Sequence, residues 1–343
     1  MSPVSKLRVL ALMHEGLVPP EDVRGIDLRE QRWKMEYDVV SALRRMGHEA
    51  YPLAVGSDLT VIRTALQELK PHLAFNLLED FHDVTIFDQN VVSYLELLRV
   101  PYTGCGPRGL LLARDKALSK KLLAFHRIAV PDFAVFSRGR KVRRPRRLDF
   151  PIIVKSLTHE ASAGISQASV VADDEALKER VRFVQESLDT DAIGERYIEG
   201  LELYVGLVGN ERLAVLPVWE LSFNRLPEAA RPIATDRVKW SSKYQKKHGI
   251  KTAEAKGLPP ELLEKIQHVC RRAYRILGLN GYARIDMRLD ASGKVYVLEA
   301  NPNPQLAHDE DFADSAQQAG ISYEDLLQRI LNLGLKWRSE RLS

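Results

Sequence analysis

Short apolar runs alternate with longer amphipathic segments through the first third of the chain. The run LRVLALM predicts a first strand, and Met35, Val39 and Leu43 follow it at helical spacing. The same pattern then predicts strands at 50–55, 72–78 and 100–106 and helices at 58–69 and 88–99. Strands that alternate with helices in this way indicate a mostly parallel sheet flanked by helices, and so the α/β class. No G-x-G-x-x-G sequence follows the first strand, so we do not expect this part to bind NAD in the usual way.

The rest of the chain is expected to form further subdomains, because 343 residues exceed the size at which a single core usually stops growing. A helix is predicted at 110–126, then a buried strand in FPIIVK and a loop of small residues in THEASAGIS. From residue 192 onward the chain is rich in strands and α+β in character. We therefore expect an N-terminal domain at 1–107, a central subdomain with the small-residue loop at 108–191, and a C-terminal subdomain at 192–343.

Charge and composition limit the classes of partner. The net charge of +4 is too small to indicate nucleic acid as the main partner. Basic side chains crowd segment 138–147 without aromatic residues for base stacking, so we interpret it as a solvated connector rather than a nucleic-acid-binding arm. No stretch is long and apolar enough to span a membrane, and the first apolar run is too short for a signal peptide, so we expect a cytoplasmic protein. Cys105 and Cys270 are too far apart to indicate a disulfide framework.

A predicted hairpin carries the residues with the most specific chemistry. Its strands, YARIDMRLD and KVYVLEAN, flank the turn-forming sequence Asp290-Ala291-Ser292-Gly293. With a four-residue turn, Leu289 pairs with Lys294, Asp286 with Val297 and Arg284 with Glu299. Alternation then predicts one polar face and one apolar face: the polar face carries Arg284, Asp286, Glu299 and Asn301, and the apolar face carries Ala283, Ile285, Met287 and Leu298.

Carboxylate and amide oxygens on one rigid face are suitable ligands for Mg²⁺, which takes its remaining ligands from water and phosphates. The alternative is a polar face that is merely solvated, as in many antiparallel hairpins. The sequence Asn301-Pro302-Asn303-Pro304 favours the metal site, because two prolines end the ladder just where the amide would need to be held.

Together with its neighbours, the hairpin resembles the ATP-grasp superfamily, and within it the D-alanine–D-alanine ligases. The matching segments, in chain order, are PYTGCGPRGLLLARDKALSKKLL, FPIIVKS, GERYIEGLELYV, SSKYQKK, GYARIDMRLD, VYVLEANPNP and QAGISYEDLLQRIL. The resemblance implies an ATP-grasp fold, with an N-terminal parallel-sheet domain, a small central lid domain and a C-terminal antiparallel-sheet domain. It also implies ATP as co-substrate, a pair of Mg²⁺ ions with Mn²⁺ as an alternative, and a homodimer.

The resemblance further implies a role for each matching residue. The positions expected to bind ATP are Lys116, Lys155, Ser162, Gly164, Glu195, Arg196, Tyr197, Ile198 and Glu202. Among these, the two lysines would hold phosphates, residues 195–198 would form the adenine hinge, and Glu202 would bind the ribose. The expected metal ligands are Asp286, Glu299 and Asn301. The expected catalytic residues are Arg284 on the negative oxygen of the tetrahedral intermediate, Lys243 and Tyr244 on a closing loop, and Glu15 on the substrate ammonium.

The implied reaction converts a carboxylate to an acyl phosphate, which an amine then attacks, with release of ADP and phosphate. The chain departs from D-alanine–D-alanine ligases after Asn301, where Pro302-Asn303-Pro304-Gln305 and an acidic stretch at 308–311 replace the family's T-x-P-G-M and serine. Acidic side chains there would repel a substrate carboxylate or attract an ammonium. We therefore expect a small carboxylate and amine other than two D-alanines. A true D-alanine–D-alanine ligase and a catalytically inactive ATP-binding module stay open as alternatives.

Overall fold

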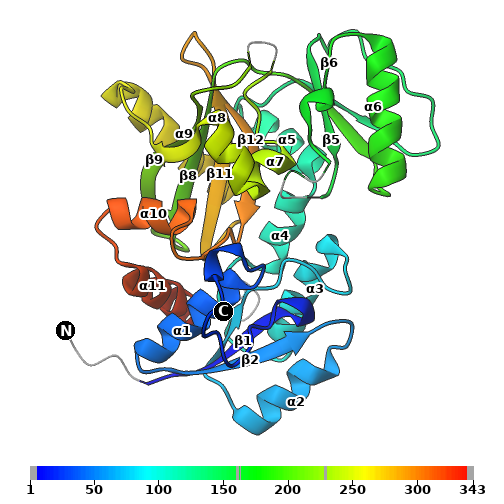
Figure 1. The fold of residues 1–343 in the computed structure, drawn as a ribbon. Helices are drawn as coiled ribbons and strands as arrows, with labels where there is room; N and C mark the ends of the chain where they lie inside the picture. The colour runs from blue at the N-terminus through cyan, green and yellow to red at the C-terminus, as the bar shows by residue number, and fades with distance from the viewer. Residues whose placement is uncertain (1–5, 160–161, 163, 228–229, 338–343) are drawn as a thin grey trace.

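The N-terminal part of the chain is an α/β domain, drawn in blue and cyan in Figure 1. The computed structural model describes residues 6–159, 162, 164–227 and 230–337. The first sheet is parallel, with β1 (Arg8–His14) between β2 (Glu49–Val55) and β3 (Leu73–Asn76). The helices that alternate with these strands are α1 (Lys34–Arg45), α2 (Thr60–Leu69) and α3 (Asp88–Leu97). The predicted alternation is confirmed, except that 100–106 contributes only an isolated bridge from Tyr102 to Ala74 instead of a strand.

The helix predicted at 110–126 is in fact two helices, α4 (Pro107–Arg114) and α5 (Lys116–Phe125). Asp115 separates them, and its carboxylate accepts hydrogen bonds from the backbone N–H groups of Ala117 and Leu118. Such N-capping satisfies donors that have no partner inside the helix, and so it begins a new helix at this point. As a result Lys116 is the first residue of α5.

The central subdomain is a four-stranded sheet covered by one helix. The strand order is β4 (Phe133–Phe136), β7 (Ala192–Arg196), β5 (Ile152–Ser156) and β6 (Val170–Val171), and α6 (Asp174–Ser187) packs on it. Leu177, Val181 and Val184 of α6 form a core with the strands. The boundary expected after residue 191 would separate β7 from its own sheet, so we propose that the central subdomain extends through Arg196.

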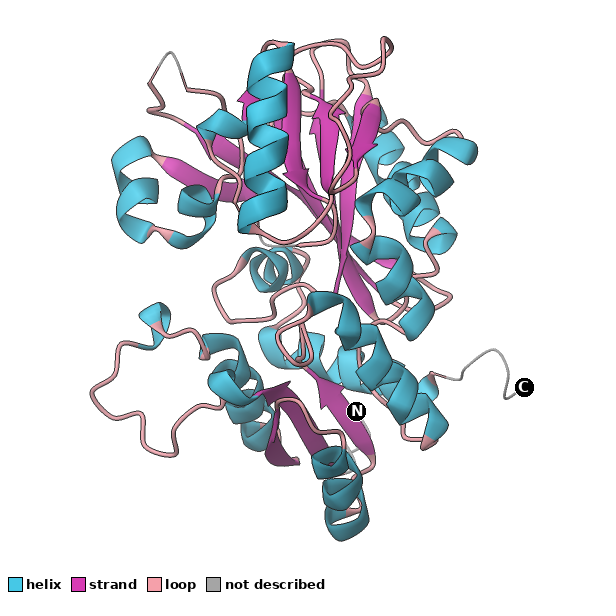
Figure 2. Cartoon of the chain, turned by 90° about the vertical axis from the view of Figure 1, so that its right-hand side faces the viewer, coloured by secondary structure: helices cyan, strands magenta, loops and turns pink. Residues whose placement is uncertain are grey.

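The C-terminal subdomain is built on a five-stranded antiparallel sheet. Its order is β10 (Ile250–Glu254), β9 (Ala214–Phe223), β8 (Leu201–Val208), β11 (Tyr282–Leu289) and β12 (Val295–Pro302). Its helices are α7 (Asp236–Trp240), α8 (Ser242–His248), α9 (Pro260–Ile276), α10 (Asp311–Gln318) and α11 (Tyr323–Lys336). Buried residues of α9, including Cys270 and Tyr274, share a core with β8 and β11. Figure 2 shows this sheet above the small parallel sheet of the N-terminal domain.

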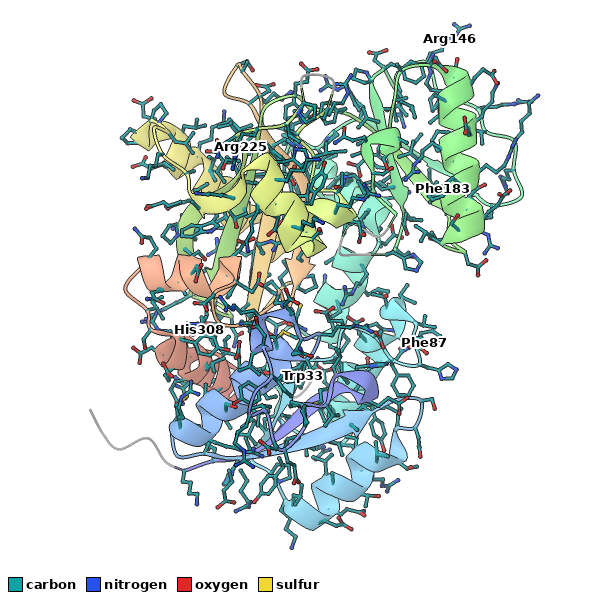
Figure 3. All side chains as sticks on the ribbon, in the orientation of Figure 1. Trp33, Phe87, Arg146, Phe183, Arg225 and His308 are labelled. Carbon is teal, nitrogen blue, oxygen red and sulfur yellow. The ribbon has the colours of Figure 1, made fainter. Side chains whose placement is uncertain are left out.

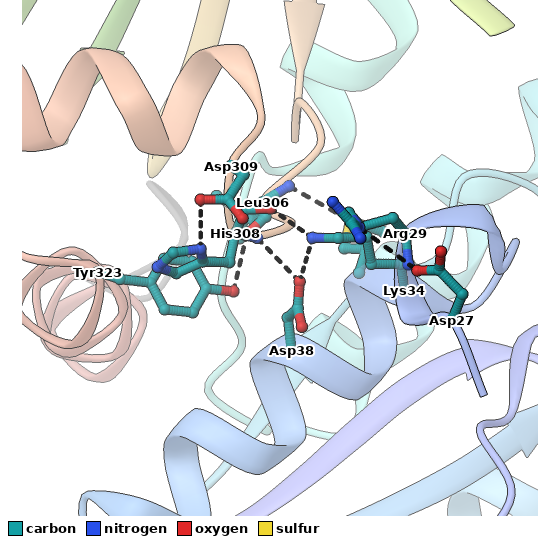
Figure 4. Close-up of polar contacts among 9 residues, drawn as sticks. Asp27, Arg29, Lys34, Asp38, Leu306, His308, Asp309 and Tyr323 are labelled. Atoms are coloured by element: carbon teal, nitrogen blue, oxygen red, sulfur yellow. Dashed lines mark hydrogen bonds and ion pairs between the residues drawn. The ribbon is translucent and has the colours of Figure 1, made fainter. Parts of the chain in front are cut away.

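The N-terminal domain packs directly against the C-terminal subdomain. One apolar core joins Val9 and Val39 to Tyr282 and Phe312. Polar contacts add to it (Figure 4): Lys34 donates to the backbone oxygen of His308, and Asp38 accepts from the His308 backbone N–H.

Short 3₁₀ turns occur at Glu15–Leu17, Leu28–Glu30, Thr85–Phe87 and Gln167–Ser169. No helix within the described ranges is both long and apolar enough to cross a membrane.

Candidate active site

A cleft lies between the central sheet and the C-terminal sheet. Its empty volume is about 790 Å³, part of it open to solvent, which is within the range of small-molecule sites. Ten of the residues predicted from the sequence line it: Lys116, Lys155, Ser162, Glu195, Arg196, Tyr197, Ile198, Glu202, Asp286 and Glu299. Of the other predicted residues, Gly164, Arg284, Asn301, Lys243, Tyr244 and Glu15 are not in this lining. Residues 160, 161 and 163 of the small-residue loop lie outside the described residues.

The hairpin of β11 and β12 brings the predicted metal ligands together, but in a different register from the expected one. Asp286 pairs with Glu299, and Arg284 pairs with Asn301. The turn holds five residues, since Leu289 pairs with Val295, and the Asp290 carboxylate accepts hydrogen bonds from the N–H groups of Ser292 and Lys294 inside it. The predicted four-residue turn and its pairings are therefore wrong, whereas the shared polar face is present.

The register changes once along the hairpin, between Asp286 and Met287, and Leu298 has no partner on β11. An extra residue of this kind is a β-bulge, which redirects the side chains that follow it. Leu298 lines the cleft beside Glu299, so its predicted place on the apolar face is wrong. The longer turn and the bulge each shift the register by one residue, and together they bring Glu299 opposite Asp286.

The two carboxylates have opposite electrostatic surroundings. Burial raises the pKa of Asp286 and the charge of Glu299 adds to this, while Arg284 opposes it with contacts of 2.7 Å from Nε to Oδ1 and 2.9 Å from Nη2 to Oδ2. Burial would also raise the pKa of Glu299, but the ammonium groups of Lys116, Lys155, Lys239 and Lys120 outweigh it and lower the pKa to about 2. Glu299 is therefore ionised throughout the physiological range.

The donor set fits a hard divalent cation. Asp286 and Glu299 lie opposite each other in the ladder, and the carboxylate of Glu299 has no hydrogen bond or ion pair with any of the described residues. The buried Nδ2 of Asn301 likewise has no hydrogen-bond partner in the described part of the chain, so neighbouring groups do not fix the orientation of this amide. Oxygen ligands from two carboxylates and an amide match the preference of Mg²⁺.

Two lysines, Lys116 and Lys155, line the other side of the cleft, and a third, Lys120, is buried near them. Lys116 donates to the backbone oxygen of His159 at 2.6 Å, and Lys155 and Lys120 lie 3.2 and 3.1 Å from the two carboxylate oxygens of Glu195. Glu195 is 0% exposed and is held between these ammonium groups, so its side chain neutralises lysines. Binding of an adenine edge would therefore fall to the backbone that follows Glu195.

Arg288 pairs with Glu202, the predicted ribose carboxylate. The Arg288 guanidinium also donates to the backbone oxygens of Gly200 and Pro232, and the Tyr204 hydroxyl donates to Glu202 at 2.9 Å. Gly200 has a φ of +137°, and a Cβ there would lie 1.9 Å from the backbone oxygen of Leu289, so the turn before Glu202 requires glycine. Arg288 was not among the predicted residues, although its period-two spacing from Arg284 and Asp286 could have identified it.

Neither Lys243 nor Tyr244 of the predicted closing loop lines the cleft. Lys239 of α7 lines the cleft, whereas Lys243 of α8 is exposed. Tyr244 packs on His248, with ring centroids 4.3 Å apart, and on the apolar cluster that includes Trp219. Lys243 and Tyr244 thus stay predictions about a more closed arrangement, and Lys239 is a further cation of the cleft, besides Arg288, that was not predicted.

Glu15 lies in the N-terminal domain, next to Gly56, outside the cleft. Beside it, His14 Nε2 is 3.8 Å from Asp80 Oδ1 and 3.6 Å from Asp83 Oδ1, a spacing that could suit a metal ion. However, His14 Nδ1 accepts a hydrogen bond from the Gly16 N–H at 3.0 Å, so a neutral ring carries its proton on Nε2, facing the carboxylates. The pattern favours a hydrogen-bonded histidine over a metal ligand.

The arginine-rich segment is remote from all of these groups. Figure 3 shows Arg146 at the outer end of the central subdomain, pointing away from the protein. Arg144 pairs with Asp174 and lies over the Phe150 ring, with the guanidinium carbon 4.6 Å from the ring centroid. These contacts are consistent with a solvated connector.

Two antiparallel sheets that enclose a cleft with lysines on one side and paired carboxylates on the other define an ATP-grasp protein, and this class of fold is also that of solved relatives. The structure of D-alanine–D-alanine ligase from Bacillus anthracis complexed with ATP superposes with a TM-score of 0.74, covering 96% of this chain and 98% of that one, at 22% identity. The arrangement places the chain among the ATP-dependent ligases that form C–N bonds.

The sequence comparisons identify the family. Residues 122–332 match the family model described as D-ala D-ala ligase C-terminus. A D-alanine–D-alanine ligase from Desulforudis audaxviator is 32% identical over 315 residues, which cover 90% of this chain and 94% of that protein. The uncharacterized protein y4sG from Sinorhizobium fredii is also 32% identical, over 303 residues that cover 86% of this chain and 85% of that protein. The chain belongs to the D-alanine–D-alanine ligase family.

Proposed function

We propose that the protein joins a small carboxylate to an amine through an acyl phosphate, with a substrate pair other than two D-alanines. The observation that carries the proposal is the pairing of Asp286 with Glu299 in a cleft whose opposite side holds Lys116 and Lys155. Phosphoryl transfer needs this combination, because negative charge accumulates on the transferred group and must be neutralised on several sides.

In the proposed reaction Asp286, Glu299 and Asn301 would hold Mg²⁺, which supplies charge neutralisation at the phosphates. Lys116 and Lys155 bind the phosphate oxygens and orient them toward the substrate carboxylate. Arg284 faces the oxyanion that forms when the amine attacks the acyl carbon. Its guanidinium is oriented in advance by Asp286 and by the Tyr204 ring, whose centroid is 4.7 Å from the guanidinium carbon, and a preoriented cation stabilises a transition state efficiently.

The segment after Asn301 supports a different substrate pair. Asn303, with a φ of +52°, accepts a hydrogen bond from the Cys105 N–H at 2.7 Å, and a Cβ on Gly104 would lie 2.4 Å from its Oδ1. This asparagine is therefore committed to holding the loop before α4. Burial lowers the pKa of the Arg284 guanidinium, and Asp286 raises it most, through its charge and its hydrogen bonds. Asp311, which follows Asn303 shortly afterwards, adds to this rise.

The negative charge that Asp311 adds to the surroundings of Arg284 disfavours an amine substrate with a free carboxylate and favours one with an additional positive charge. We therefore propose that the acceptor lacks a carboxylate near its reacting amine or carries a second ammonium group. D-alanine has neither property.

The experiment is a screen for ADP release with the full-length protein, ATP and Mg²⁺, across D- and L-amino acids, hydroxy acids and amine acceptors. Release that requires one carboxylate and one different amine supports the proposal. Release with D-alanine alone identifies a D-alanine–D-alanine ligase, and ATP binding without release for any pair identifies an inactive module. The homodimer that the resemblance implies is tested separately by sedimentation equilibrium.

A further inference from the structure

Lys120 carries an amino group into an almost completely enclosed position, with 1% of its surface exposed. Lysine is rarely buried this deeply without partners, so its contacts explain why the position holds it. It lies one helical turn after Lys116 on α5, but it does not line the cleft, whereas Lys116 does. Its role therefore has to be found in the groups that it contacts.

The first contact is with the β-bulge. Lys120 Nζ donates to the backbone oxygen of Leu298, the residue that has no partner on β11. β12 is an edge strand, so its outer backbone groups have no neighbouring strand. At the bulge these backbone groups form hydrogen bonds with α5 and the segment that follows it. Lys120 donates to the Leu298 carbonyl, and the Ala129 backbone oxygen accepts from the Val297 N–H at 2.9 Å. Lys120 thus holds the residue that immediately precedes Glu299.

The second contact is with Glu195. Lys120 Nζ lies 3.1 Å from Glu195 Oε1, while Lys155 Nζ lies 3.2 Å from Oε2 of the same carboxylate. Glu195 thereby connects the two ammonium groups, and it begins the backbone segment that continues along the cleft through Ile198. Removal of Lys120 would leave one oxygen of a buried carboxylate without a cation and would free Lys155 to move.

We infer that Lys120 is a positioning residue that couples the metal-binding carboxylate Glu299 to the phosphate-binding Lys155, through the Leu298 bulge and through Glu195. It acts without touching ATP. The inference rests on the proposed function, because it assumes that the cleft binds ATP and a divalent cation.

The test compares Lys120→Met with Lys121→Met. The two changes remove the same charge from neighbouring positions of α5, and Lys121 is exposed. Partners that hold a metal ligand from behind typically change metal affinity or activity by 10- to 100-fold when they are removed. We expect Lys120→Met to raise the half-saturating Mg²⁺ concentration and the calorimetric Kd for ATP about tenfold. The KM for the amine substrate should change less than twofold, and Lys121→Met should resemble wild type.

A lower thermal midpoint with wild-type Mg²⁺ and ATP dependence would mean that Lys120 only stabilises the fold, and the inference would then be wrong. If Lys120→Met does not fold, two further measurements replace it. The first uses Lys120→Arg, and the second compares the double variant Lys120→Met/Glu195→Gln with Glu195→Gln. Lys120→Arg retains a donor for Leu298 and should stay within about threefold of wild type. In the double variant no unpaired carboxylate remains at position 195, but the hydrogen bond from Lys120 to the Leu298 backbone oxygen is still missing. The double variant should therefore need more Mg²⁺ than Glu195→Gln alone. Equal Mg²⁺ requirements would overturn the inference.

The calorimetric measurement separates this inference from the proposed function. If wild-type protein binds ATP but releases no ADP with any substrate pair, the proposed reaction is wrong. The ATP affinity of Lys120→Met still tests the role of Lys120 in that case. Wild-type protein that binds no ATP in the presence of Mg²⁺ contradicts both.

Discussion

Asp286 on β11 lies directly opposite Glu299 on β12, because Leu298 adds one unpaired residue to β12 just before Glu299. Directly opposed residues on one face of an antiparallel pair have Cβ atoms ~4.5–5.5 Å apart, and like charges at that separation are destabilising. The lysines around Glu299 and the guanidinium beside Asp286 offset this repulsion in part. Such a pair is a reasonable site for a divalent cation, and it leads to the first prediction.

Asp286→Asn and Glu299→Gln should each abolish Mg²⁺-dependent ADP release while leaving the far-ultraviolet circular dichroism unchanged. Each amide keeps the shape of the side chain but removes the charge that a hard cation requires. Glu261→Gln, at an exposed position at the start of α9, is a control that should behave as wild type. Normal turnover by both site variants would show that Asp286 and Glu299 are not ligands of Mg²⁺.

Arg284→Ala should lower the rate of amide formation by about 10²- to 10³-fold, the usual effect of removing an oxyanion-stabilising group. The calorimetric Kd for ATP should change much less, because Arg284 is not in the lining of the cleft. Arg284→Lys should restore little, since an ammonium cannot reproduce the two parallel contacts to Asp286. A collapse of ATP affinity in Arg284→Ala with an unchanged catalytic rate would assign this residue to nucleotide binding instead.

The polar face of the hairpin could be predicted because strand alternation depends only on a period of two. The bulge could not, because one additional residue has no signature in the composition of VYVLEAN. The register of the whole site therefore had to come from the structure. A signal that was available but missed is Asp115, since an aspartate directly before Lys116 is a typical helix start.

Long-range contacts account for the remaining differences. Lys239 lines the cleft from α7, but the sequence between residues 224 and 240 has no periodicity that would predict a helix there. Lys120 follows Lys116 by one turn of a predicted helix, yet nothing in the sequence distinguishes the buried Lys120 from the exposed Lys121. Burial of a lysine depends on β7 and β12, which are distant in the chain.

Lys239→Met should raise the KM for ATP about tenfold, whereas Lys243→Met should change it less than threefold. The reason is that Lys239 lines the cleft and its charge acts on both Asp286 and Glu299, while Lys243 is exposed. Initial rates of ADP release at varied ATP concentration measure the difference. A larger effect for Lys243→Met would show that α8 moves into the cleft when ATP binds and would favour the role expected from the sequence.

Glu36, on the first turn of α1, leads to a prediction about stability and pH. It is 1% exposed, and neither of its carboxylate oxygens has a hydrogen-bond partner within the described residues. Burial raises its pKa from 4.5 to about 7; the backbone N–H of Glu36 itself opposes this shift, and the charge of Glu79 adds to it. The folded protein therefore binds a proton at Glu36 more tightly than the unfolded chain does.

Because the pKa of Glu36 is higher in the folded state, this stabilisation is complete below about pH 4.5 and is lost as the pH rises to about 7. Glu36→Gln, which stays neutral, should increase the free energy of unfolding by up to about 3 kcal/mol at pH 8 and hardly at all at pH 4.5. Urea unfolding at the two pH values measures this. Glu68→Gln, at an exposed position on α2, should change stability by less than about 0.5 kcal/mol at both. An equal effect of Glu36→Gln at pH 4.5 and pH 8 would mean that the Glu36 carboxyl has a polar partner in solution and is not held neutral by its burial.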